Sequence, residues 1–131
     1  MRTLSDVLET ASEIGKPFWS AMAEGRLDLP LCNACKKAFF HPRKICPNCW
    51  ASDIGWTTSK GAGTVWSLTV NHTTLMGVTK EDLPFAAGLV DLDDGVRLPA
   101  YFSMNALPKI GQRVQCTFPK PGQFPVFMPA A

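Results

Sequence analysis

Four cysteines stand in two pairs with a gap of two residues, Cys32 with Cys35 and Cys46 with Cys49. A two-residue gap lets a tight turn direct both sulfurs at one ion, and two such turns complete a tetrahedron of thiolates. Because four thiolates leave no open coordination position, the spacing predicts a structural Zn²⁺ ion that does not activate water.

Two other chemistries use the same residue types. A redox pair of the thioredoxin kind needs one Cys-x-x-Cys on a βαβ frame, which this sequence lacks. A mononuclear iron site of the rubredoxin type has the same four ligands, and the spacing does not separate iron from zinc. The fifth cysteine, Cys116, alternates with Val114 and Phe118. It is predicted to be a small apolar filler inside a barrel.

The remaining residues with titratable side chains form no catalytic constellation. His41 fits an exposed loop position better than a hydrogen-bond donor to the metal ligands. His72 fits a structural role or a contact with a partner, because no nucleophile is placed by motif beside it. The acidic residues at positions 91, 93 and 94 fit a charged turn. We therefore predict no catalytic residue.

The elements that position the cysteines divide the chain into three regions. Residues 1–27 are predicted to form a helical hook, in which Gly15 ends a first helix and Gly25 ends a second. Residues 28–58 are predicted to form a ribbon that the metal holds together. Residues 59–131 are predicted to form a small closed β-barrel. The fold class expected is mainly β with N-terminal helices.

The barrel prediction depends on alternating apolar and polar residues and on the turns between them. Trp66, Leu68 and Val70 are expected on one face of the first strand. In the third strand, apolar residues from Val96 to Phe102 alternate with outward-facing ones. Five short strands fit a small closed barrel, which leaves no exposed sheet edge. The expected strands cover residues 64–71, 85–92, 96–104, 114–118 and 124–128.

Composition excludes several classes of protein. The chain has 131 residues, of which 46% are hydrophobic, and this is ordinary for a globular protein. Its net charge of +2 is spread evenly along the sequence, which does not favour a nucleic-acid binder. No apolar run approaches the roughly 20 residues of a membrane helix, and no secretory signal is evident. A soluble, cytoplasmic protein is expected.

The order of several short motifs, from about Lys16 to Pro129, resembles a known family. It is the family of zinc-ribbon/OB-fold proteins long catalogued as a domain of unknown function and often encoded beside thiolases. The motifs are Phe18-Trp19, Leu31-Cys32-x2-Cys35, Phe40-His41-Pro42-Arg43, Cys46-Pro47-x-Cys49, Trp56, Gly61-x-Gly63-Thr64-Val65-Trp66-Ser67 and Val96-Arg97-Leu98.

The resemblance implies a helical hook at residues 1–27, a rubredoxin-like zinc ribbon at residues 28–58 and a five-stranded OB-fold barrel at residues 59–131. It also implies a partner and a role. Members of this family assemble with thiolase-fold, condensing-type enzymes, including thiolases, acyltransferases and aldolases, and complete or bridge the large subunit. The metal-binding role carries over to the four matching cysteines. A contact with a CoA thioester would fall around Phe40, Arg43 and residues 61–66. The basic residues at positions 36, 37, 43 and 44 fit solvated surface charge better than a phosphate site.

Three functions compete at this point. The first is a small zinc-binding accessory subunit of a thiolase-like acyl-CoA or acyltransferase hetero-oligomer, not catalytic alone. In that reading the apolar pair Phe18 and Trp19 belongs to a contact surface for another subunit. The second is a single-stranded nucleic-acid-binding OB-fold protein, which would need a basic groove with exposed aromatics. The third, a stand-alone acyl-CoA enzyme, lacks a nucleophile–base pair.

Overall fold

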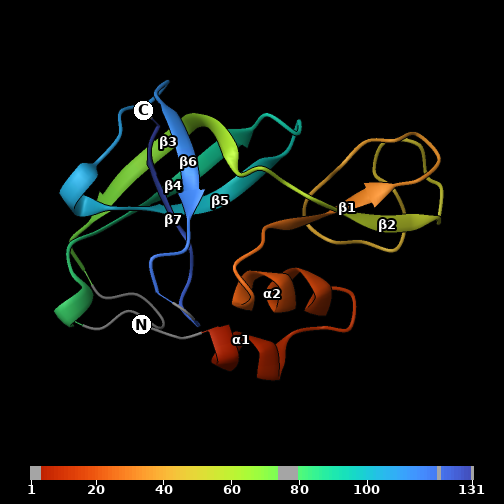
Figure 1. The fold of residues 1–131 in the computed structure, drawn as a ribbon, viewed down its shortest axis with the longest axis horizontal. Helices are drawn as coiled ribbons and strands as arrows, with labels where there is room; N and C mark the ends of the chain where they lie inside the picture. The colour runs from red at the N-terminus through yellow and green to blue at the C-terminus, as the bar shows by residue number, and fades with distance from the viewer. Residues whose placement is uncertain (1–3, 74–79, 121, 131) are drawn as a thin grey trace.

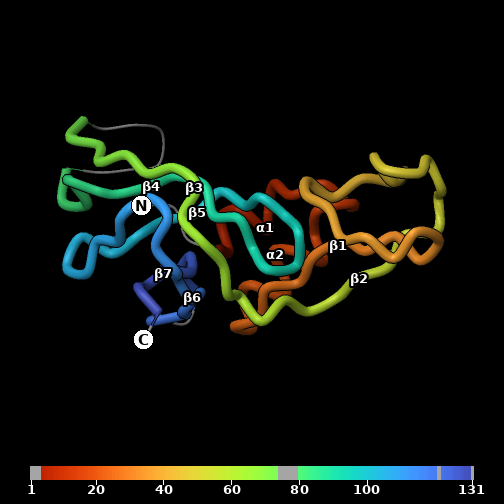
Figure 2. The backbone as a smooth tube through the Cα atoms, turned by 90° about the horizontal axis from the view of Figure 1, so that it is seen from above, coloured from red at the N-terminus to blue at the C-terminus, as the bar shows by residue number. Residues whose placement is uncertain are grey.

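The computed structural model describes residues 4–73, 80–120 and 122–130, and it confirms the expected fold class. A zinc ribbon projects from a closed five-stranded barrel, and two short helices lie in the corner between them (Figures 1 and 2). The helices are α1 (Leu4–Thr10) and α2 (Lys16–Ala23), with 3₁₀ turns η1 (Lys80–Asp82) and η2 (Met104–Ala106). The strands are β1 (Asp28–Cys32), β2 (Ile54–Thr58), β3 (Ala62–Asn71), β4 (Phe85–Leu92), β5 (Arg97–Phe102), β6 (Arg113–Thr117) and β7 (Val126–Pro129).

The first helix ends earlier than the sequence pattern predicts. Helix α1 stops at Thr10, and Gly15 is the N-cap residue of α2, with a φ of −86°. The prediction that Gly15 ends the first helix is therefore wrong. Ser12 explains the difference, because its hydroxyl accepts a hydrogen bond from the Gly15 backbone N–H and its carbonyl accepts one from that of Lys16. Such local bonds compete with helix propagation.

The end of α2 is the one predicted. Gly25 has a φ of +84°, a left-handed conformation that glycine adopts without steric cost. The N–H of Gly25 bonds to the carbonyl of Met22, and that of Arg26 bonds to the carbonyl of Ala21. This pair of bonds is a Schellman motif, and it turns the chain from α2 into the ribbon.

The ribbon is attached to the barrel through Ser59, a buried polar residue. Its backbone N–H bonds to the carbonyl of Leu27, 2.8 Å away. Its hydroxyl donates to a carboxylate oxygen of Asp94 at 2.6 Å and accepts from the Gly61 N–H at 3.0 Å. Since these bonds join the hook, the end of the ribbon and the β4–β5 turn, they position the ribbon relative to the barrel.

The barrel closes in the order β3-β4-β5-β7-β6. Val96, Leu98 and Phe102 are buried, as their alternation in sequence predicts, and Phe127 of β7 packs in the same core. Four of the five seams are antiparallel, whereas β5 meets β7 in parallel through the single pair Phe102 and Phe127. The β5–β7 seam is therefore the shortest.

A β-bulge in β3 changes the expected face of one residue. The register of β3 against β4 shifts between Val65 and Ser67. Val65 is buried, whereas Trp66 is 50% exposed and carries the Arg97 guanidinium over its ring, 3.8 Å from the centroid. The prediction that Trp66 shares a face with Leu68 is therefore wrong. The extra residue of the bulge turns Trp66 outward.

Gly88 pairs with Leu68 beside the bulge, where the two strands come close together. A Cβ atom built on Gly88 would lie 2.1 Å from the backbone oxygen of Ser67.

None of the helices in the described part of the chain has the length and apolar character needed to traverse a lipid bilayer.

Candidate metal centre

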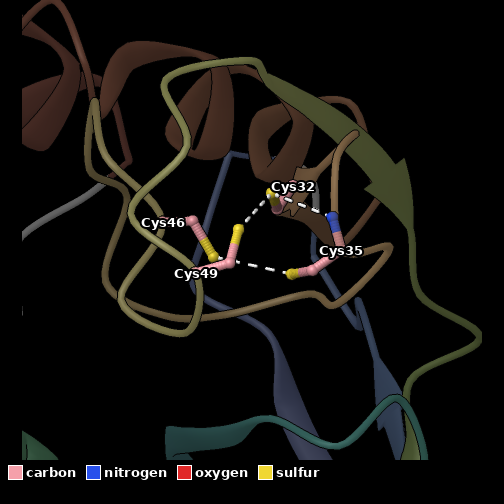
Figure 3. A group of neighbouring side chains, drawn as sticks. All are labelled: Cys32, Cys35, Cys46 and Cys49. Carbon is pink, nitrogen blue, oxygen red and sulfur yellow. Dashed lines mark hydrogen bonds between the residues drawn. The ribbon is translucent and has the colours of Figure 1, made fainter.

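The structure brings the four paired cysteines together at the free end of the ribbon. Their sulfur atoms all lie within 4.8 Å of one another, and all four side chains converge on one point (Figure 3). The Sγ atoms of Cys32 and Cys49 are 3.5 Å apart, and those of Cys35 and Cys46 are 3.7 Å apart. Each knuckle thus faces the other across a space for one ion.

The first knuckle follows strand β1, whose last residue is Cys32. The backbone N–H of Cys35 points at the Cys32 sulfur, 3.4 Å away, and the N–H of Lys36 bonds to the Cys32 carbonyl at 2.8 Å. Lys36 has a φ of +64°. The Cys32 N–H in turn bonds to the carbonyl of Lys37 at 3.0 Å, which closes the loop.

The second knuckle repeats the backbone bonds of the first, although the N–H that points at the sulfur comes from the second residue after the cysteine and not from the third. The N–H of Asn48 points at the Cys46 sulfur at 3.3 Å, and the N–H of Trp50 bonds to the Cys46 carbonyl at 3.0 Å. Trp50, like the residue after the first knuckle, has a positive φ, here +67°. The Cys46 N–H bonds to the carbonyl of Ala51 at 2.9 Å. Neither left-handed position could be predicted from the sequence, because neither is occupied by glycine.

Hydrogen bonds from backbone N–H groups lower the pKa values of two of the four thiols. The pKa of Cys32 is lowered, chiefly by the hydrogen bond from the Cys35 backbone. Burial raises the pKa of Cys46, but hydrogen bonds from the backbones of Asn48 and Cys49 outweigh it and bring that pKa to about 6. Because a metal binds the thiolate and not the thiol, a lowered pKa leaves more of each sulfur in the ligand form at neutral pH.

Cys49 has the opposite shift. A hydrogen bond from the Ala51 backbone lowers its pKa, but its proximity to the thiols of Cys32, Cys35 and Cys46 raises it to about 11. Four negative sulfurs at this separation repel one another unless a cation lies between them. The donor set therefore fits a dication with a preference for sulfur, and the closed tetrahedral arrangement fits a structural zinc.

The other candidate residues lie apart from this centre or on its surface. His41 is exposed and stacks on Phe40, with ring centroids 4.3 Å apart. Arg43 is exposed in the ribbon loop between the knuckles. His72 is exposed just after β3. The structure does not bring the two histidines together with any of the cysteine pairs.

The acidic residues near the β4–β5 turn are engaged by neighbouring arginines. Asp91 accepts hydrogen bonds from Arg97, at 2.7 and 3.2 Å, and Asp93 accepts two from Arg113, at 2.7 and 2.6 Å. The hydrogen bond from the arginine is the main reason that the pKa of each carboxyl is lowered. These carboxylates hold strands together and make no paired acid–base site.

Cys116 lies away from the metal centre and packs against the barrel core. Burial raises the pKa of its thiol to about 12.

Because only the thiolate is nucleophilic, we expect Cys116 of the native protein to react with iodoacetamide at pH 7.5 roughly a thousandfold more slowly than an ordinary cysteine. Peptide mapping by mass spectrometry would measure this. The rate should recover only as the pH approaches 12, and alkylation at the rate of a free thiol would contradict the prediction.

Two family models match adjoining parts of the chain. The rubredoxin-like zinc ribbon domain of ChsH2 matches residues 19–55, and the C-terminal OB-fold domain of ChsH2 matches residues 56–119. The fold and the cysteine centre define a zinc-ribbon/OB-fold protein, and the two matches together span most of the chain. The protein belongs to the ChsH2 family. A comparison with curated proteins found no significant match.

Two solved structures are similar to the whole chain. One, described as the Ltp2-ChsH2 (DUF35) aldolase, is 27% identical, covers 92% of this chain and 98% of its own, and has a TM-score of 0.77. Another is a DUF35-family protein of unknown function from Sulfolobus solfataricus, 18% identical over 96% of both chains with a TM-score of 0.63. The second similarity concerns the fold alone.

Proposed function

We propose that this protein is a small accessory subunit of a thiolase-like acyl-CoA enzyme complex. The observation that carries the proposal is its membership of the ChsH2 family, together with its similarity over nearly its full length to a chain of an Ltp2-ChsH2 aldolase. The partner would be a larger condensing-type enzyme, and the two would form a hetero-oligomer in the cytoplasm. The hook, ribbon and barrel, divided after residues 27 and 58, would each contribute surface to it.

The four clustered cysteines would bind a structural Zn²⁺ ion. Cys32, Cys35, Cys46 and Cys49 supply only thiolate ligands, so the ion would fill its coordination sphere with protein and would hold the ribbon in shape. Few apolar side chains pack in the ribbon. Its own buried cluster consists of Cys32, Phe39 and Cys46. A module with so small a core needs the ion to stay folded.

The features of the described residues support an accessory role over independent catalysis. Both histidines are exposed, Asp91 and Asp93 are bound to arginines, and Asp94 accepts a hydrogen bond from Ser59. Chemistry would therefore come from the partner. Contact with a CoA thioester would fall near the junction of ribbon and barrel, around Phe40, Arg43 and residues 61–66.

The alternative of single-stranded nucleic-acid binding has less support. OB folds bind nucleic acid on the face of their second and third strands, here β4 and β5. Arg97 on this face is bound to Asp91 and stacked on Trp66, so it is not free for phosphate. Other outward-facing positions carry apolar residues such as Ala87 and Pro99. A phosphate backbone would find little positive charge there.

Co-purification from the native host tests the proposal. A tagged copy of this protein should capture a thiolase-fold enzyme in a stable stoichiometric complex. The isolated protein should contain zinc and show no acyl-CoA turnover, whereas the partner should lose most of its activity when this subunit is absent. Full activity of the partner alone, or capture of nucleic acid in a salt-dependent manner, would contradict the accessory role.

A further inference from the structure

An apolar cavity of about 360 Å³ lies between α2, the ribbon and the barrel. Its volume falls in the range of roughly 300–1,000 Å³ that is usual for small-molecule sites. Phe18 and Trp19 of α2 form one wall, Phe40 and His41 of the ribbon form a second, and β4, β5 and residues 124–127 form the rest. Three regions of the chain therefore meet around one space.

Contacts between rings hold the walls in place. The Phe18 ring lies 4.9 Å from that of Trp19, edge to face, and 5.0 Å from that of Phe40. The Phe124 ring makes edge contacts with Trp19 at 6.1 Å and with Tyr101 at 5.9 Å. These are preferred aromatic geometries, and each pair adds stability beyond its buried area. The cavity is thus preformed by the chain itself and does not need a partner protein to build it.

The chemistry of the walls defines what the cavity can hold. The lining contains no Asp, Glu, Lys or Arg residue, and only Trp19, His41 and Tyr101 have polar side-chain atoms. Pro99 and Pro125, also in the lining, have no backbone N–H to donate. An ionised group would lose its hydration here without gaining a partner. The cavity therefore fits a hydrocarbon group with at most a few polar atoms.

The cavity lies on the face of the barrel that OB folds commonly use to bind ligands. Ala87 and Gly88 of β4 and Tyr101 of β5 belong to the second and third barrel strands, the face on which OB folds bind their ligands. The cavity also reaches the short β5–β7 seam, because Leu98 and Phe127 line it. At this seam the barrel core itself contributes apolar surface to the site.

We propose that this cavity binds the uncharged hydrocarbon part of a small-molecule ligand, an extended chain or a fused ring. If the protein acts in an acyl-CoA complex, this ligand is the acyl group of the thioester, and that identity rests on the proposed function. The binding itself does not, because every wall belongs to this chain. In such a complex the accessory subunit would therefore bind part of the substrate, its acyl group, directly.

Methyl NMR on the isolated, zinc-loaded full chain tests the proposal with two ten-carbon alcohols, 1-decanol and 2-decalol. Met22, Ala87 and Ala100 line the cavity, so the NMR signals of their methyl groups should shift in a saturable manner as alcohol is added. The methyl signal of Ala34, in the first knuckle, should not shift. Saturable binding of 1-decanol alone would assign an extended chain, and of 2-decalol alone a fused ring. Binding of both also supports the proposal.

Substitutions separate the cavity from other apolar surface. Ala87→Leu projects a longer side chain from β4 into the cavity and should weaken binding by at least about tenfold. Ala23→Leu, at an exposed position near the end of α2, should change it by less than about twofold. Tyr101→Ala enlarges the site and should shift preference towards a longer alcohol, 1-dodecanol, which provides a second test if Ala87→Leu does not fold.

Three results would overturn the proposal. The first is that the methyl signals do not shift with either alcohol up to its solubility limit. The second is that the shifts do not saturate, or that the Ala34 signal shifts as much as those of the lining residues. The third is that Ala87→Leu leaves the affinity for the alcohols unchanged. Failure to capture a thiolase-fold enzyme would refute the proposed function and leave alcohol binding intact. Conversely, a complex that forms normally while neither alcohol binds would refute the cavity proposal alone.

Discussion

Replacing Cys46 with serine should release the metal and unfold the ribbon. Cys46 is buried, and its sulfur accepts the Asn48 N–H, so no other group can take its place among the four ligands. Structural zinc contributes about 10–16 kcal/mol in small zinc-dependent modules, and a site that loses one of four thiolates loses much of this. Elemental analysis of pure Cys46→Ser protein should find only a small fraction of the one ion per chain expected in the wild type.

The fifth cysteine provides the matched control. Cys116→Ala also removes one thiol, but from the wall of the barrel, and it should retain one ion per chain and the association with the partner enzyme. Chelation of the wild-type protein should reproduce the Cys46→Ser result, with loss of the ribbon's NMR signals and of partner binding. A Cys46→Ser protein that kept full metal content and an intact ribbon would show that the four-thiolate centre does not exist.

Gly88→Ala should destabilise the barrel by about 3 kcal/mol, because the added methyl group overpacks a contact between two backbones. The clash would be with the carbonyl oxygen of Ser67, 2.1 Å from the new Cβ atom, and a backbone atom cannot rotate away as a side chain does. Relieving it would require β3 and β4 to separate at the bulge. Thermal unfolding should show a melting temperature lower by roughly 10 °C.

A second glycine tests whether the effect is local. Gly15 also lacks a side chain, but its φ of −86° is open to any residue, and the atom nearest to a new Cβ atom would be the Ser12 hydroxyl oxygen at 3.3 Å. Gly15→Ala should therefore change stability by less than about 1 kcal/mol. Equal losses in the two variants would mean that the closeness of β3 and β4 at Gly88 is not the cause.

Sequence reasoning succeeded where a short stretch of chain determines its own structure. The two cysteine pairs predict two tight turns, and Gly25 predicts the end of α2, because in each case the chemistry lies within about six consecutive residues. The strands from Phe85 to Leu92 and from Arg97 to Phe102 are also local, since the turn at residues 93–95 bounds the first and alternation of apolar residues identifies the second. The ribbon and the closed barrel followed from these patterns, and the family resemblance identified the barrel as an OB fold.

Other features depend on residues that are distant in sequence. The outward position of Trp66 depends on the register between β3 and β4, and Gly88 in the opposite strand permits the close approach. The early end of α1 is, by contrast, a local feature, because Ser12 bonds to the backbone of Gly15 and Lys16. A periodicity count assumes uninterrupted geometry, so it places residues correctly only until a bulge or a cap intervenes.

Ligand type and spacing are local properties of two turns, so the amino-acid sequence is enough to identify the residues that can form the metal centre. Three features could be seen in the folded chain alone: the sulfurs of the two knuckles converge, Ser59 joins the ribbon to the barrel, and α2, the Phe40–His41 segment and Phe124 line one cavity. Cavity walls come from side chains on segments far apart along the chain, and packing is what brings these segments together.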